Sequence, residues 1–324
     1  MNTLSRTQPK YRDRLPQLDG RRVLSCGGLE TTLIFHEGWD LPAFASFVLV
    51  ETERGRERLR AYFDRYIDIA ERHGTGFLLE TPTWRANPEW GATLGYDLDG
   101  LERVNRELVA LAMDIRDRRE TPTMPMPLSG NIGPRGDGYD PRAATSAQEA
   151  ADYHSWQIGV LKDAGADLVS AFTISSSAEG LGIALAAKKA DMPCVISFTL
   201  ETDGRLPTGE HLGEVITAID IETGNAPAYY MINCAHPTHF EGMLREGGAW
   251  TRRLGGLRAN SSRRSHAELD NATELDIGNP AELGGEYAEI LERFPHINVL
   301  GGCCGTDERH VAAIGAHCCG GATA

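Results

Sequence analysis

Apolar segments along the chain alternate with longer stretches in which apolar residues recur every three or four positions. The short segments are typical of buried strands. The longer stretches are typical of amphipathic helices, as in Leu101, Val104, Leu108, Leu111 and Ile115. This alternation predicts an α/β fold in which helices cross between parallel strands.

Eight segments have the character of strands. They are Val23–Cys26, Gly76–Glu80, Met124–Asn131, Asp167–Phe172, Cys194–Phe198, Ala228–Asn233, Gly256–Asn260 and Ile297–Gly301. Helices are expected at Arg54–His73, Leu101–Arg119, Ser146–Ala164, Ala178–Lys189 and Glu282–Arg293. Although 324 residues also accommodate two smaller domains, eight strands separated by helices favour a single (β/α)8 TIM barrel. Its active site is expected at the C-terminal ends of the strands.

The two ends of the chain differ from the predicted barrel, which spans residues 21–318. Residues 1–20 are polar and contain no apolar run, so we expect a disordered or surface arm. Residues 319–324 are expected to form a flexible tail. Because no stretch resembles a signal peptide or a membrane-spanning helix, the sequence predicts a cytoplasmic protein.

The formal net charge of −14 argues against nucleic acid or an anionic membrane as a partner. One local group of arginines departs from this balance and is expected to form surface or helix–helix salt bridges without a function of its own. It comprises Arg252, Arg253, Arg258, Arg263 and Arg264. The seven cysteines of a cytoplasmic chain are expected to be reduced thiols rather than disulfides.

Three cysteines follow the ends of predicted strands. Cys234 comes after the sixth strand, and Cys303 and Cys304 come after the eighth, between glycines that allow a tight bend. Two adjacent cysteines alone are compatible with an ordinary buried core pair. In a barrel, however, all three thiols reach the same mouth, which favours a zinc site with a fourth position open to water or substrate, as in catalytic zinc centres.

The segments after the strands carry a family resemblance that covers nearly the whole chain. They are Gly27-Gly28-Leu29-Glu30-Thr31, Glu80-Thr81-Pro82-Thr83-Trp84, Gly130-Asn131-Ile132-Gly133-Pro134, Asn233-Cys234 and Gly301-Gly302-Cys303-Cys304-Gly305. Together they resemble the homocysteine S-methyltransferase family. The resemblance implies a zinc-dependent barrel that transfers a methyl group to homocysteine and produces methionine, with Cys234, Cys303 and Cys304 as the zinc ligands.

The resemblance also assigns roles around the metal. The turn Gly27-Gly28-Leu29-Glu30 is implied to hold the homocysteine carboxylate through backbone N–H groups, the alternative being a simple tight turn. Asn233 is expected either to orient a ligand by a hydrogen bond or to cap a strand end. Zinc lowers the pKa of a bound thiol, so it would supply the attacking thiolate.

Two positions depart from the family pattern. Cys26 stands where the family commonly has an aspartate, and Phe172 stands where it has a glutamate; those acids hold the amino group of homocysteine. Glu30, Glu80 and Glu179 are possible substitutes, or else ordinary surface and structural acids. Cys26 is either a fourth zinc ligand in the absence of substrate or an inert buried thiol.

Other residues give weaker signals. His236 and His239 resemble a ligand pair but are expected to mark the start of a helix, with Pro237 in its first turn. Cys318 and Cys319 are expected to be incidental. Arg85 is expected to contact either a substrate anion or a neighbouring carboxylate.

The methyl donor is expected to be a small cation such as S-methylmethionine, S-adenosylmethionine or betaine, because the large domains of folate and cobalamin users of this family are absent. Trp39, Trp84 and Tyr139 are candidates to hold that cation, or else to pack. No glycine-rich nucleotide fingerprint follows a strand, so no nucleotide cofactor is expected. The expected partners are therefore a small-molecule thiol and its donor. The alternatives are a zinc-holding, thiol-binding barrel without transfer, and a methyltransferase for a thiol that lacks the α-amino group.

Overall fold

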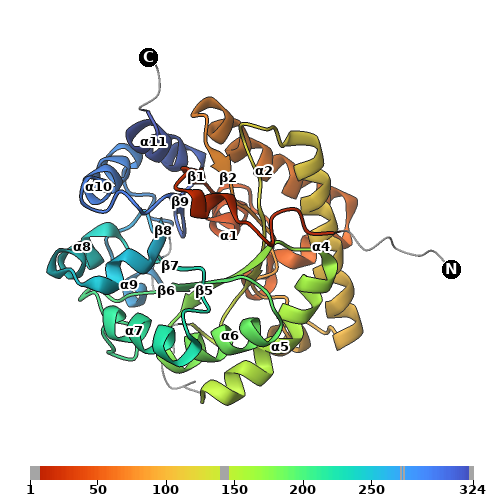
Figure 1. The fold of residues 1–324 in the computed structure, drawn as a ribbon. Helices are drawn as coiled ribbons and strands as arrows, with labels where there is room; N and C mark the ends of the chain where they lie inside the picture. Colours follow the sequence, from red (N-terminus) through yellow and green to blue (C-terminus); the bar gives the residue numbers. More distant parts are fainter. Residues whose placement is uncertain (1–7, 139–145, 271, 273, 321–324) are drawn as a thin grey trace.

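The computed structural model describes residues 8–138, 146–270, 272 and 274–320. Its strands are β1 (Val23–Leu24), β2 (Gly76–Phe77), β3 (Leu79–Glu80), β4 (Leu128–Ile132), β5 (Leu168–Ile174), β6 (Cys194–Phe198), β7 (Tyr229–Asn233), β8 (Leu254–Ala259) and β9 (Val299–Gly302). The strands form a central parallel sheet that the larger helices surround (Figure 1). The expected α/β barrel is thereby confirmed.

The helices are α1 (Leu29–Thr31), α2 (Glu53–Arg72), α3 (Pro88–Thr93), α4 (Leu98–Arg119), α5 (Ala147–Ala164), α6 (Ser177–Lys189), α7 (Leu212–Thr223), α8 (Pro237–Glu246), α9 (His266–Asp270), α10 (Pro280–Arg293) and α11 (Glu308–Cys318). Their ends follow local chemistry. A capping box joins Ser146 and Glu149 at the start of α5, and Gly165, with φ of 102°, ends that helix in the left-handed conformation that glycine adopts without steric cost.

The sheet closes through one interrupted strand. Its order is β2-β1-β9-β8-β7-β6-β5-β4-β3, so β2 and β3 are its two ends. Only Leu78 separates them; β2 pairs with β1, and β3 pairs with β4. The predicted strand Gly76–Glu80 is therefore present, but it changes partner halfway and closes the barrel. The strand expected from Met124 begins only at Leu128, because Pro125 and Pro127 have no N–H to donate to a ladder.

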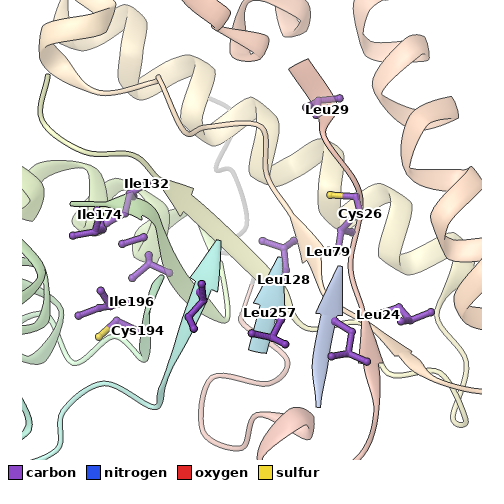
Figure 2. Close-up of a cluster of buried hydrophobic side chains, with 14 of the residues drawn as sticks. Leu24, Cys26, Leu29, Leu79, Leu128, Ile132, Ile174, Cys194, Ile196 and Leu257 are labelled. Atoms are coloured by element: carbon purple, nitrogen blue, oxygen red, sulfur yellow. The ribbon is translucent and has the colours of Figure 1, made fainter. Parts of the chain in front are cut away.

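The core has two layers that follow the alternation of side chains along the strands. One set packs with the helices and includes Leu24 of β1, Leu79 of β3, Leu128 of β4 and Leu257 of β8 (Figure 2). The other set fills the inside of the barrel. It contains Val23, Leu78, Leu168, Phe172, Val195, Tyr229, Met231 and Val299.

Residues 8–20 are part of the fold rather than a free arm. Leu15 is 3% exposed and joins the inner layer of the core, and a 3₁₀ turn follows at Pro16–Asp19. The backbone N–H groups of Lys10 and Tyr11 donate to buried Asp167 at 2.7 and 2.8 Å. This segment thus closes the N-terminal end of the barrel, away from the strand ends that carry the cysteines. The expected tail lies outside the described residues from 321 on.

Cys318 and Cys319, at the end of α11, are half-buried against the core. Among the described residues, no helix combines the length and the apolar character needed to span a bilayer.

Candidate functional site

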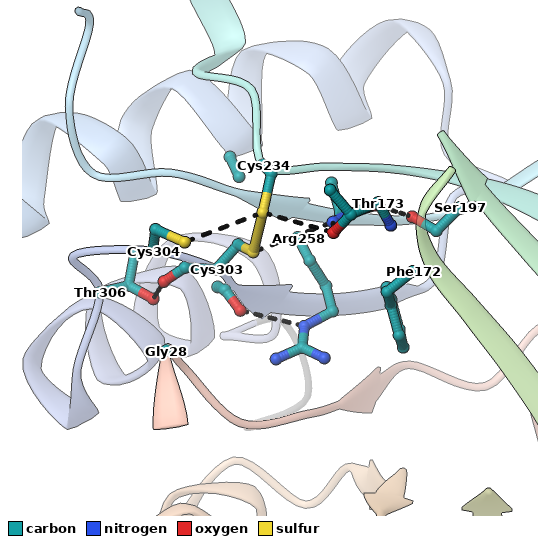
Figure 3. Close-up of a disulfide and its surroundings, with 12 residues drawn as sticks. Gly28, Phe172, Thr173, Ser197, Cys234, Arg258, Cys303, Cys304 and Thr306 are labelled. Carbon is teal, nitrogen blue, oxygen red and sulfur yellow. Dashed lines mark hydrogen bonds between the residues drawn. A yellow bond between two sulfur atoms is a disulfide. The ribbon is translucent and has the colours of Figure 1, made fainter. Parts of the chain in front are cut away.

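The three predicted ligand cysteines lie together. Cys234 follows β7, Cys303 and Cys304 follow β9, and their three Sγ atoms all lie within 4.8 Å of one another (Figure 3). The Sγ atoms of Cys234 and Cys304 are 3.9 Å apart. Two thiolates on a tetrahedral zinc, each at about 2.3 Å from the ion, lie about 3.8 Å apart. This pair therefore has the spacing that a zinc ion requires.

Two of the three sulfurs form a disulfide. We expected reduced thiols, but Cys234 and Cys303 are joined, with 5.5 Å between their Cα atoms and 69 residues between them in sequence. A group of thiols close enough for one metal ion is also close enough for oxidation, which sequence spacing cannot reveal. Metal binding through all three sulfurs requires this pair to be reduced.

The backbone beside the cysteines adopts an uncommon conformation. Cys234 has φ of 52°, and Thr173, at the C-terminal end of β5, has φ of 64°. The left-handed region is costly for a β-branched residue and is found mostly where structure or function requires it. Here it directs both side chains to one place, since the Thr173 hydroxyl lies 3.9 Å from the Cys234 sulfur.

Asn233 connects the neighbouring strands at this point. Its Oδ1 accepts from the Thr173 backbone N–H at 3.0 Å and from the Ser197 hydroxyl at 2.7 Å. Its Nδ2 donates to the Thr173 hydroxyl at 3.0 Å and lies 3.9 Å from the Cys303 sulfur. The amide is therefore fixed beside the Cys303 sulfur, while the Thr173 hydroxyl that it binds lies beside the Cys234 sulfur.

The glycine turn after β1 packs directly against the cysteine segment. A Cβ on Gly28 would stand 2.6 Å from the Cys303 carbonyl oxygen, so only glycine fits. The Gly28 N–H donates to the Thr306 carbonyl at 3.0 Å, which commits that group to the fold. The following residues, Leu29 and Glu30, begin α1.

Arg258 corrects the interpretation of the arginine group. It is not on the surface: it is buried at the end of β8, where Nη1 donates to Glu80 Oε2 at 2.7 Å. Its Nε donates to the Gly302 carbonyl at 3.0 Å, and Nη2 donates to the Gly27 carbonyl at 3.2 Å. The guanidinium lies 4.9 Å from the centre of the Phe172 ring (Figure 3). The sequence analysis grouped Arg258 with surface arginines because they are close in sequence. Its place within a predicted strand was the signal that its side chain could be buried.

Cys26 belongs to this second group rather than to the three sulfurs. Its Sγ donates to Glu80 Oε2 at 3.4 Å and lies 3.6 Å from Arg258 Nη2. Burial raises the pKa of the Cys26 thiol to about 12, although Arg258 opposes the rise. Of the two roles expected for Cys26, a fourth zinc ligand or an inert buried thiol, this environment favours the buried thiol.

A cavity of about 370 Å³ connects both groups. Its wall includes the three sulfurs, the glycine turn, Asn233, Phe172 and the Glu80–Arg258 pair. Glu30 also lines it and accepts from the Ser46 hydroxyl at 2.6 Å; burial raises the pKa of its carboxyl. Glu179, in contrast, is a structural acid that pairs with His154 at 2.9 Å and accepts from the Arg135 N–H.

The weaker candidates have structural contacts. His236 caps the start of α8, as expected, and burial lowers its pKa to about 4. Arg85 lies 4.2 Å from the Trp84 ring centre and donates to the Gly136 carbonyl at 3.2 Å. Arg54 lies similarly over Trp39, at 4.6 Å. The rings of Trp39 and Trp84 therefore already make cation–π contacts with arginines of this chain. Tyr139 lies outside the described residues.

The His236 and His239 rings are 6.1 Å apart, and within the described parts of the chain the metal-ligand group consists of the three cysteines without them.

The fold and the site define a class: an α/β-barrel enzyme whose reactive groups gather at the carboxyl ends of the strands. The model of the family described as homocysteine S-methyltransferase matches residues 23–318. The chain therefore belongs to the homocysteine S-methyltransferase family and is a methyltransferase.

Individual relatives are distant in sequence. The chain is 23% identical to a selenocysteine Se-methyltransferase of Brassica oleracea var. italica over 97% of its own length and 93% of that protein. It is 25% identical to homocysteine S-methyltransferase 1 of Arabidopsis thaliana over about half of each chain, 52% and 51%.

Two solved structures share the fold, both of the homocysteine methyltransferase MmuM from Escherichia coli. The oxidized form matches with a TM-score of 0.72 at 23% identity, covering 92% of this chain and 97% of that one. The metallated form matches with a TM-score of 0.70 at 22% identity and the same coverage.

Proposed function

We propose that this protein is a zinc-dependent S-methyltransferase that moves a methyl group from a small cationic donor to a thiol, homocysteine by default, giving methionine. The observation that carries the proposal is the convergence of Cys234, Cys303 and Cys304 at the edge of a cavity of about 370 Å³. Three sulfur ligands leave one tetrahedral position, and the cavity gives a small thiol access to it.

The three thiols of the reduced protein suit zinc in number, type and spacing. A bound zinc ion would supply the positive charge that keeps the acceptor thiol ionised, since a free thiol has a pKa of about 8.5. Asn233 and Thr173 contact the Cys303 and Cys234 sulfurs and would hold them in orientation.

The rest of the site would position the acceptor. The Gly28 N–H is engaged, so the N–H groups of Gly27, Leu29 and Glu30 in this turn would be the donors for a substrate carboxylate. The Phe172 ring and the buried Arg258–Glu80 pair form the wall beyond.

The transfer itself is a displacement at carbon. The acceptor sulfur forms a bond to the methyl carbon while the bond from that carbon to the positively charged donor atom breaks. The electron pair stays on the donor atom, which loses its positive charge as the demethylated donor leaves. S-methylmethionine, S-adenosylmethionine and betaine all satisfy this balance. The cavity wall carries three carboxylates, those of Glu30, Glu80 and Asp137, against two guanidinium groups, those of Arg85 and Arg258, and this balance favours a cation.

Metal content and methyl transfer should be measured on the same reduced protein. We expect one zinc per chain and transfer from at least one of the three donors to homocysteine, and loss of both zinc and transfer in Cys303→Ser. Cys319→Ser, a matched change at the end of α11, should retain both. Zinc without transfer to any thiol would favour a thiol-binding barrel, and absence of zinc would refute the proposal.

A further inference from the structure

Glu80 lines the cavity and has one carboxylate oxygen without a hydrogen-bond partner among the described residues. Its side chain is 1% exposed, and Oε2 is occupied by Arg258 and Cys26. Oε1 is buried and has no hydrogen-bond partner among the described residues. A buried carboxylate oxygen without a donor is energetically unfavourable, and native structures rarely leave one so.

The neighbours of Glu80 do not compete for a ligand. All three nitrogens of Arg258 already donate, to Glu80, to the Gly302 carbonyl and to the Gly27 carbonyl. Arg258 therefore fixes the carboxylate and is committed to the protein. The Phe172 ring covers the guanidinium and carries no charge. Asn131 Oδ1 and Asn260 Oδ1 on the same cavity wall also have no hydrogen-bond partner among the described residues. Of these three acceptor atoms, Glu80 Oε1 is the one that belongs to a carboxylate.

The charges nearby favour a cationic donor at that atom. Three carboxylates, those of Glu30, Glu80 and Asp137, line the cavity with two guanidinium groups, those of Arg85 and Arg258. Burial lowers the pKa of Arg258, but Glu80 and, more weakly, Glu30 raise it overall, so both lie within electrostatic reach of the guanidinium. A ligand ammonium would balance the third negative charge, and an N⁺–H donor forms the stronger kind of hydrogen bond with a carboxylate.

We propose that Glu80 Oε1 binds the α-ammonium group of the substrate, so that the acceptor is an amino-acid thiol although positions 26 and 172 carry no acid. Arg258 and Cys26 are positioning residues that hold Glu80 Oε2. The proposal rests on the proposed function for the identity of the reaction, but the binding of the amino group is independent of zinc and of transfer.

The test compares two ligands that differ only in the amino group. L-Methionine, the expected product, and 4-(methylthio)butanoate should be titrated calorimetrically into the full-length wild-type protein and into Glu80→Gln. We expect the wild type to bind methionine about 100-fold more tightly, the effect of one buried charged hydrogen bond. In Glu80→Gln the two affinities should agree within about threefold.

Further measurements keep the test decisive. Glu80→Gln leaves Arg258 without its charge partner, so its folding is checked first. If it does not fold, the wild-type pair of ligands and Glu30→Gln decide: the proposal requires the preference for methionine in both proteins. Equal affinities in the wild type, or no binding of methionine, would overturn the proposal. So would loss of discrimination in Glu30→Gln but not in Glu80→Gln.

Kinetics separate this proposal from the proposed function. The wild type should use homocysteine with a higher kcat/KM than 4-mercaptobutanoate, which lacks the amino group. In Glu80→Gln we expect this preference to be lost, mainly because KM for homocysteine rises. Discrimination in binding without transfer to any thiol would refute the proposed function and leave the ammonium site supported.

Discussion

Single residues at the strand ends determine how the cysteines are presented. Thr173 and Cys234 both have positive φ, a conformation that is unfavourable by about 1–2 kcal/mol for a residue other than glycine. Asn233 offsets part of this by bonding to the Thr173 backbone, the Thr173 hydroxyl and the Ser197 hydroxyl. The side chain that holds this strained backbone also contacts the Cys303 sulfur, so geometry and ligand orientation depend on one amide.

Replacement of that amide should weaken metal binding before it unfolds the protein. We expect Asn233→Ala to lower zinc affinity by about 10- to 100-fold, because the partners that orient metal ligands contribute effects of that size. Competition with a chromogenic chelator measures the change. Ser197→Ala removes only one bond to the same Oδ1 and should cause a smaller loss. Equal affinity in wild type and Asn233→Ala would contradict this role.

At the scale of elements, periodicity along the sequence predicted most of the architecture. The amphipathic spacing of Leu101 to Ile115 corresponds to α4, and the apolar segments correspond to strands. Sequence did not show that β2 and β3 separate at Leu78, because that depends on which strands lie on either side.

The site was partly predictable from sequence. The convergence of the three cysteines was predicted because they directly follow strand ends, and Asn233 was noted because it is the last residue of the strand before Cys234. Arg258 was missed because its neighbours in sequence, Arg252 and Arg253, suggested a surface group. Its inward position in β8 is fixed by the alternation that buries Leu257 on the opposite face. The disulfide and the Glu80–Arg258 pair join segments distant in sequence, so only the fold brings them together.

The start of α11 should contribute to stability in a pH-dependent way. Burial alone would raise the pKa of Asp307, but hydrogen bonds with His310 and Arg309 hold it well below its usual range. A carboxyl with a depressed pKa stabilises the fold above its unfolded pKa of about 4, and this contribution is lost as pH falls further.

We therefore expect the free energy of unfolding to fall by about 1 kcal/mol through this group between pH 5 and pH 2, after allowance for solvent screening. Asp307→Asn retains a capping side chain but not the charge, so its unfolding free energy should depend less on pH in this range. Urea titrations at several pH values provide the measurement, and identical acid slopes in the two proteins would exclude this contribution.

For the whole molecule, the N-terminal segment completes the barrel at the end opposite the cavity. Asp167 is fully buried and accepts from four donors: the Lys10, Tyr11 and Leu128 N–H groups and the Arg116 guanidinium. Leu15, which follows Lys10 and Tyr11 in the same segment, packs in the inner layer of the core. The segment therefore contributes to global stability rather than to the site.

Leu15→Ala should lower the free energy of unfolding by about 2–4 kcal/mol, because it removes a buried side chain and leaves a cavity. Leu18→Ala is the matched control, since Leu18 is 56% exposed in the same segment, and it should change stability by less than about 0.5 kcal/mol. Chemical denaturation of both variants tests the comparison. Equal effects of the two changes would mean that the segment does not support the core.

The alternation of the strands has a further consequence for how such a barrel acquires new specificity. Glu80, Phe172, Asn233 and Arg258 occupy inward positions near the ends of four strands, each next to a residue that packs against the helices. Changes at these inward positions leave the helix-facing residues in place, but Asn233 and the Glu80–Arg258 pair also hold the strand ends together. The Phe172 side chain has no such bond and only covers the guanidinium, so position 172 is the place where a new side chain can change the choice of acceptor thiol at the least cost in stability.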